Sequence, residues 1–133
     1  MTTEELKERT KQFAPRIMRL VDALPKSAKG RARAGQVVRS GTSVAANYRA
    51  ACRARSRAEF IAKIGIVEEE ADETALWLEL IIADRLFDKA KVQPLLTEAN
   101  ELVAIMAASY MSAQRNGASA PPKSAIRTQK SAI

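Results

Sequence analysis

The chain has 133 residues, only five glycines and no strand-like alternation of apolar and polar residues, so it favours one all-α domain with a modest core. Histidine is absent and Cys52 is the single cysteine, which excludes an intramolecular disulfide and removes the commonest metal ligand and general base. The net charge of +7 is uneven, since residues 1–57 hold fourteen Lys or Arg against four Asp or Glu, residues 58–114 four against eleven, and residues 115–133 four against none. Such a division can serve pairing between basic and acidic helices inside the fold or a basic outer surface for nucleic acid.

The first predicted helix covers residues 3–24, where apolar side chains recur at steps of four and three. Thr2 or Thr3 is suited to cap it, and acidic residues in the first turn suit the helix dipole. Pro15 lacks an N–H and its ring opposes the carbonyl four residues earlier, so we expect a kink near Lys11. The alternative is that the ordered helix begins close to Pro15.

The second predicted helix covers residues 31–54, after a basic connection at residues 26–30. Its middle, residues 40–43, is poor helix-forming sequence and contains Gly41. A glycine inside a helix costs about 1 kcal/mol relative to alanine, so we expect a bulky neighbour to approach there, with Trp77 as the candidate. This favours a packing notch over a phosphate-cradling loop, which would need more glycines and a preceding strand.

The third predicted helix, residues 57–85, has the most regular apolar spacing in the chain. Seven positions follow one another at steps of four and three: Phe60, Ile64, Val67, Ala71, Thr74, Leu78 and Ile81. Acidic residues occupy the opposite side, and Ser56 with Glu59 forms a capping-box pattern at the start. Because a helix of this length is not stable alone in water, we expect the stripe to be covered by the other helices.

The fourth predicted helix runs from Pro94 to about Arg115, since proline is well accepted at a first helical position. Residues 102–113 of this helix carry no charge, and their apolar side chains occupy most of the circumference: Leu102, Val103, Ile105, Met106, Tyr110 and Met111. One core-facing stripe needs fewer apolar sides, so the excess predicts a subunit interface and a homo-oligomer. The bundle domain is thus expected over residues 1–115. Residues 116–133 are predicted to be a disordered basic tail, which can touch phosphates or be merely solvated.

The sequence offers no catalytic constellation, so we predict that the protein is not an enzyme and has no metal or cofactor. Glu69, Glu70 and Glu73 lack the histidine partners of a di-iron bundle. Cys52 lies on an apolar flank without a histidine beside it, which is typical of a small core residue. Asn47 lies near a packed stripe and needs partners, which we expect to be Glu70 or Glu73.

The chain carries no leader-like segment at its start, and its longest apolar runs are too short to cross a bilayer. The single cysteine fits a reducing compartment. We therefore expect a bacterial-type cytoplasmic protein with no membrane partner.

Seven basic residues form the candidate nucleic-acid site. They lie before, at the start of, and along the second helix: Lys26, Lys29, Arg31, Arg33, Arg39, Arg49 and Arg53. Guanidinium forks suit phosphate oxygens, whereas the scarcity of aromatic residues argues against base stacking, so binding would be electrostatic and shape-directed. The alternative is an ordinary solvated surface that also pairs with the acidic third helix.

Three stretches carry a family resemblance: Glu-Leu-Lys-Glu-Arg-Thr at residues 5–10, Arg-Ser-Gly-Thr-Ser-Val-Ala-Ala-Asn-Tyr-Arg at residues 39–49, and the acidic segment around Trp77 at residues 68–80. In this order they resemble the four-helix bundle proteins named for open reading frames in intervening sequences of 23S rRNA genes. The resemblance spans about residues 4–115. Ala50 stands where the family often has glutamate.

This resemblance implies an antiparallel up-and-down four-helix bundle that assembles as a homopentamer. The family is also similar to the accessory proteins of diversity-generating retroelements, which are pentameric barrels that bind nucleic acid and a reverse transcriptase. The expectation is therefore a non-catalytic homo-oligomer that binds RNA or DNA, with structured, ribosomal-type RNA favoured. The alternative is an oligomeric scaffold for a protein partner that does not bind nucleic acid directly.

Overall fold

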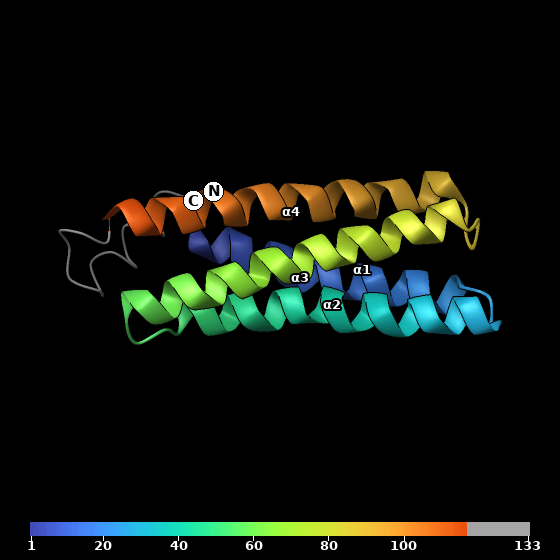
Figure 1. Cartoon of the computed structure of the whole chain (residues 1–133), viewed down its shortest axis with the longest axis horizontal. Coiled ribbons are helices and arrows are strands. Elements are labelled where there is room, and N and C mark those ends of the chain that lie inside the picture. The colour runs from blue at the N-terminus through green and yellow to red at the C-terminus, as the bar shows by residue number, and fades with distance from the viewer. Residues whose placement is uncertain (117–133) are drawn as a thin grey trace.

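The computed structural model describes residues 1–116, which form four helices. These are α1 (Thr3–Ala23), α2 (Ala28–Cys52), α3 (Arg57–Ala83) and α4 (Lys89–Asn116). Short connections make consecutive helices antiparallel, giving the elongated up-and-down bundle of Figure 1. Consecutive helices pack most extensively, and α1 meets α4 less closely. The predicted all-α four-helix bundle is confirmed for this part of the chain, while the predicted tail beyond Asn116 lies outside the described residues.

The predicted stripe on α3 is the centre of the core. All seven of its residues are buried, with Ile64, Val67 and Leu78 fully so. Ser56 caps the helix, because its Oγ accepts a hydrogen bond from the Glu59 N–H at 3.1 Å. Periodicity therefore identified the helix and its buried side correctly, and the capping pattern of Ser56 identified its start.

Helix α1 is one helix from Thr3, so the alternative start near Pro15 is wrong. Thr2 is its cap, and its Oγ1 accepts from the Glu5 N–H at 3.1 Å. Pro15 and Lys11 are both exposed, so the carbonyl that loses its helical partner faces water. An exposed proline is tolerated here for that reason.

Helix α2 begins earlier than predicted. Ser27 Oγ accepts from the Gly30 N–H at 3.2 Å, so residues 28–30 form the first helical turn rather than a connection. Gly30 is required by close packing, since a Cβ there would lie 1.9 Å from the Pro25 carbonyl oxygen. The Ser27 cap and the close approach of the Pro25 carbonyl to Gly30 therefore determine where α2 begins.

Helix α4 also begins earlier, so the predicted start at Pro94 is wrong. Asp88 provides the start, because its Oδ1 accepts from the Ala90 N–H at 3.1 Å and its carbonyl from the Val92 N–H at 3.1 Å. Pro94 lies inside the helix and deprives only the exposed Ala90 carbonyl of a partner.

The poor helix-forming segment in α2 is a packing notch, as predicted, but its neighbours differ. A Cβ on buried Gly41 would lie 3.0 Å from Ile17 Cγ1, so the bulky side chain is Ile17 of α1 and the pairing with Trp77 is wrong. On the α3 side, the hydroxyls of Ser40 and Thr74 are hydrogen-bonded at 2.8 Å. Small residues here let α2 approach both neighbouring helices.

Asn47 does not contact the acidic helix, so the predicted partners Glu70 and Glu73 are wrong. Its Nδ2 donates within α2 to the Ser43 carbonyl at 3.0 Å and to Ser43 Oγ at 2.8 Å. Beside it, Tyr48 is almost fully buried, and this desolvation raises the pKa of its phenol above the ordinary value. Tyr48 therefore acts as a neutral core residue.

Most of the apolar excess predicted on α4 is absorbed by the bundle itself. Leu102 and Met106 are buried, and three other members pack half-buried against the core: Val103, Ile105 and Tyr110. Of the six, Met111 alone is largely exposed, at 55%. Within residues 1–116, no helix is both long and apolar enough to cross a membrane.

Candidate nucleic-acid interface

The seven predicted site residues do not form one patch. Lys26, Lys29 and Arg31 are exposed around the first turn of α2, whereas Arg49 and Arg53 are exposed at its other end. At about 1.5 Å per residue, the 18 residues from Arg31 to Arg49 place about 27 Å of helix between the two groups. Only two of the seven therefore lie together at the C-terminal end of α2.

Arg39 pairs with the acidic helix, as the alternative interpretation of the basic surface expected. Its Nη2 lies 2.8 Å from Glu73 Oε1 and 3.3 Å from Glu70 Oε2. These carboxylates, Glu70 foremost, raise the pKa of the Arg39 guanidinium. Its charge is partly satisfied inside the chain, which leaves less of it for a phosphate.

Arg33 is also engaged within the bundle. Its guanidinium carbon lies 5.9 Å from the Trp77 ring centroid, and its Nη1 donates to Gln36 Oε1 at 2.9 Å. Trp77, the single tryptophan, is half-buried and lies beside this cation.

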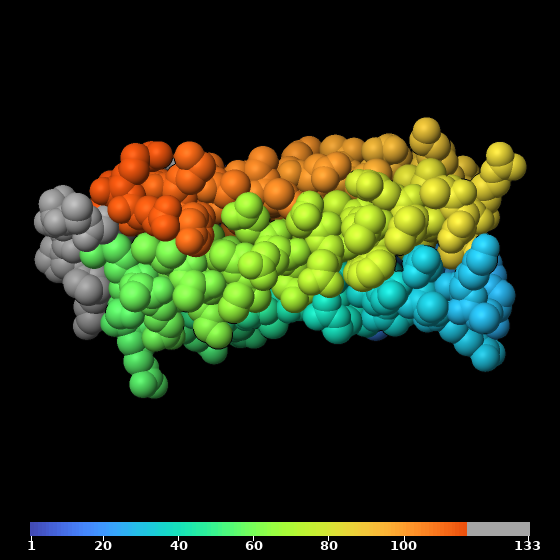
Figure 2. All heavy atoms as spheres, in the orientation of Figure 1, coloured from blue at the N-terminus to red at the C-terminus, as the bar shows by residue number. Residues whose placement is uncertain are grey.

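At the other end of α2, a shallow hollow of about 460 Å³ lies between α2 and α3. Four cations line it against one carboxylate, Glu59: Arg49, Arg53, Arg55 and Lys63. Ala46 and Ala50 complete the lining, and their short side chains keep the hollow open to an approaching group. Figure 2 shows this end of the molecule, where green side chains of α2 and α3 project from the surface.

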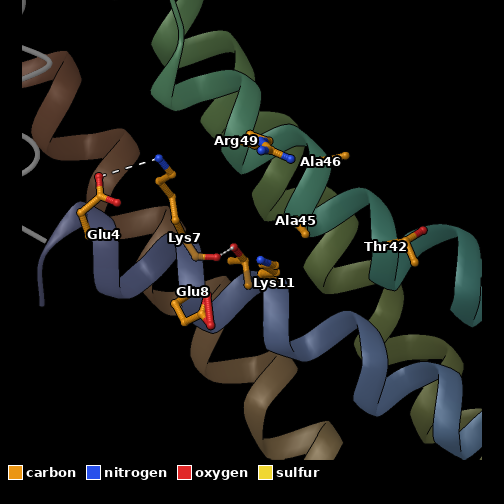
Figure 3. Close-up of a pocket in the computed structure, with 9 residues that line it drawn as sticks. Glu4, Lys7, Glu8, Lys11, Thr42, Ala45, Ala46 and Arg49 are labelled. Carbon is orange, nitrogen blue, oxygen red and sulfur yellow. Dashed lines mark hydrogen bonds and ion pairs between the residues drawn. The ribbon is translucent and has the colours of Figure 1, made fainter.

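A second hollow, of about 430 Å³, lies between α1 and α2 and shares Ala46 and Arg49 with the first. Figure 3 shows that its charged side chains come from both helices, with Lys11 on α1 and Arg49 on α2. Lys7 is paired with Glu4 at 3.7 Å. Lys11 and Arg49 form no ion pair within the described part of the chain, although Glu8 lines the same hollow.

The two hollows together define a basic belt across α1, α2 and α3. Its members are Lys11, Arg49, Arg53, Arg55 and Lys63. None of these cations forms an ion pair within residues 1–116, although three carboxylates also line the two hollows: Glu4, Glu8 and Glu59. The belt lacks aromatic lining, so its chemistry suits phosphate groups rather than stacked bases.

Sequence reasoning missed Lys11, Arg55 and Lys63, because they lie outside the second helix that supplied the predicted set. The alternating run at positions 53, 55 and 57 was the available signal for Arg55. For the two lysines the chain order gives no such signal, since the bundle topology alone brings them beside Arg49. Within residues 1–116, Cys, Asp and Glu side chains form no group of three or more that could hold a metal ion.

Comparison with known proteins agrees with the bundle. No curated protein matches this chain. The chain is similar to a crystal structure of a protein of unknown function from the S23 ribosomal protein family of Bacteroides thetaiotaomicron VPI-5482, with 35% sequence identity and a TM-score of 0.73. That similarity covers 78% of this chain and 96% of the other. Residues 3–108 match the family model described as 23S rRNA-intervening sequence protein. This match covers all four helices except the end of α4, and the chain belongs to the family of 23S rRNA-intervening sequence proteins.

Proposed function

We propose that this chain is a non-catalytic, homo-oligomeric nucleic-acid-binding protein of the cytoplasm that contacts structured RNA through the basic belt. The observation that carries the proposal is the gathering of five cations without ion-pair partners in residues 1–116, on three helices and the connection between α2 and α3, around two hollows with small side chains between them. Of the seven site residues predicted from the sequence, Arg49 and Arg53 belong to the belt, and Arg39 is paired with Glu73. The other four lie outside the belt: Lys26, Lys29, Arg31 and Arg33.

The chemistry of the belt favours a folded RNA over a flexible single strand. Single-strand binding without sequence preference relies on aromatic platforms, and neither hollow contains one. Guanidinium and ammonium groups on a rigid surface instead match the fixed phosphate spacing of a helical nucleic acid. The family to which the chain belongs takes its name from intervening sequences of 23S rRNA, which is consistent with such a ligand.

Oligomerisation would strengthen a belt of this size. One copy offers five cations, which is a modest electrostatic footprint. In a homopentamer, the assembly that the sequence resemblance implies, the belt would be repeated on each copy, and simultaneous contacts raise the apparent affinity without any new kind of contact.

A second candidate function is an oligomeric scaffold for a protein partner, without direct nucleic-acid binding. It is favoured by large apolar side chains that remain exposed on three helices: Met18, Ile66, Leu76 and Met111. Recovery of a protein partner that survives nuclease treatment supports this candidate over the first.

Titration of the full chain against a structured RNA at several salt concentrations tests the proposal. If a copy uses three to five belt cations on phosphates, the logarithm of the affinity is expected to fall with the logarithm of salt concentration with a slope of roughly −2 to −4 per copy bound. Affinity that is absent at low salt, or that does not change with salt, contradicts electrostatic RNA binding.

A further inference from the structure

The seam between α1 and α4 opens into a hollow of about 260 Å³ at the end of the bundle opposite the basic belt. Its apolar lining comes from both helices and from the loop before α4: Leu20, Ala23, Phe87, Pro94 and Leu95. Arg16, Arg19 and Lys91 complete the lining, and no carboxylate takes part. The hollow therefore combines an apolar interior with a cationic rim.

The outer face of α3 carries the complementary arrangement. Leu76 is 45% exposed there, and Glu69, Asp72 and Glu79 lie seven and four residues before it and three residues after it, on the same side of the helix. These three carboxylates are exposed and form no ion pair within the described residues, unlike neighbouring Glu73, which pairs with Arg39. An exposed leucine is thus surrounded by negative charge.

We infer that Leu76 of one copy inserts into the α1–α4 hollow of a second copy, with the carboxylates around Leu76 facing the cations of the rim. The inference rests on the proposed homo-oligomer and names its interface. Three cations meet three carboxylates that lack partners in residues 1–116, and a large apolar side chain that is exposed in one copy finds an apolar pocket in the next.

The positions of the two surfaces determine the kind of assembly. The contact is heterologous, because the outer face of α3 and the α1–α4 seam are different surfaces of the same chain. Leu76 lies seven residues, about 10 Å, before the end of α3, and the hollow is built from the last eight residues of α1 and the first seven of α4. Leu76 and the hollow are therefore at nearly the same height along the bundle axis. Neighbouring copies then lie side by side, which favours a closed ring over a filament.

This interface leaves the basic belt free. The belt lies at the end of the bundle where α2 terminates, and the hollow lies at the end where α2 begins. Side-by-side copies in one orientation bring every belt to the same rim of the ring, which concentrates positive charge on one side of the assembly.

The test is the molar mass of the full chain in solution, measured by light scattering at matched concentrations. Leu76→Ser is expected to reduce the mass toward the 14.5 kDa of one copy. Met111→Ser on α4, where the side chain is 55% exposed against 45% for Leu76, is expected to keep the wild-type mass. Both positions are exposed, so unchanged helical circular dichroism is expected for each.

Charge exchange separates the interface from a folding defect. Arg16→Glu with Arg19→Glu is expected to break the assembly, and adding Asp72→Lys with Glu79→Lys in the same chain is expected to restore it, because the charges are then opposite again. The interface is overturned if Leu76→Ser keeps the wild-type mass, if Met111→Ser alone loses it, or if the exchanged chain stays dissociated. A wild-type chain that remains at 14.5 kDa overturns both this interface and the homo-oligomer, while the RNA titration still decides nucleic-acid binding separately.

Discussion

An Arg9→Met variant is expected to lose about 2–3 kcal/mol of folding stability, because Arg9 joins α1 to α4, which pack less closely than the consecutive helices do. Its Nε and Nη2 each lie 2.7 Å from a carboxylate oxygen of Glu98 in α4, and Nη2 lies 2.5 Å from Glu101 Oε1. The Glu98 side chain is only 14% exposed, so removing the guanidinium leaves a carboxylate with little access to water. Methionine is apolar and unbranched, so it keeps part of the packing made by the aliphatic stem of Arg9. The measured loss then reports mainly the removal of the charge.

The cause of this effect predicts its pH behaviour. The hydrogen bonds that Arg9 donates to Glu98 raise the pKa of its guanidinium above the ordinary value, so the group stays charged across the neutral and moderately alkaline range. A group with a raised pKa contributes its full stability below the unfolded-state pKa, so the loss in Arg9→Met is expected to be the same at pH 7 and pH 9.

Urea unfolding followed by circular dichroism measures the loss, and Lys7→Met on the same helix is the matched control. Lys7 lies 3.7 Å from Glu4, and both side chains are well exposed, so this pair is screened by water and its loss is expected to cost less than about 0.5 kcal/mol. Equal destabilisation by the two variants contradicts the role assigned to Arg9.

Neutralising three belt arginines is expected to weaken RNA binding roughly tenfold to a hundredfold near physiological salt. The variant is Arg49→Gln with Arg53→Gln and Arg55→Gln, which line the hollow between α2 and α3. Each cation that contacts a phosphate adds about one unit to the salt slope, so the slope is expected to fall by about 2–3. Glutamine keeps much of the side-chain length and its hydrogen-bonding capacity, so the fold is expected to persist.

A charge-matched variant at the other end of the bundle provides the control. Lys26→Gln with Lys29→Gln and Arg31→Gln removes the same three positive charges from exposed positions around the first turn of α2. If binding depends on the belt, this control is expected to keep most of the affinity and slope. Equal losses in the two variants would mean that net charge alone attracts the RNA, and a larger loss in the control would place the site at the opposite end.

The buried side of α3 could be predicted from the sequence because six apolar residues and Thr74 recur at helical spacing, which places them on one side of the helix. The starts of α2 and α4 could not, because they depend on which of several polar residues caps the helix. Ser27 and Asp88 act as caps, and Pro94 is tolerated within the first turns because the carbonyl that it deprives is exposed. The start of α4 predicted at Pro94 was therefore wrong.

The candidate site was predicted only in part, because the sequence orders charges along one helix whereas the belt crosses three. Arg49 and Arg53 were identified, but Lys11 and Lys63 join them through the antiparallel topology, which places the first half of α1 and the first third of α3 beside the end of α2. The expected neighbour of Gly41 was wrong for the same reason. A contact between positions far apart in the chain can be predicted only when the order of the helices and their relative heights along the bundle axis are known.

Lysine acetylation of the full chain, with and without bound RNA and followed by mass spectrometry, tests most directly where the nucleic acid lies. Four lysines serve as reporters: Lys11 and Lys63 in the belt, and Lys26 and Lys29 at the opposite end. RNA bound to the belt is expected to protect Lys11 and Lys63 and to leave Lys26 and Lys29 reactive. Protection of Lys26 and Lys29 with continued reaction at Lys11 and Lys63 would contradict the belt as the nucleic-acid interface.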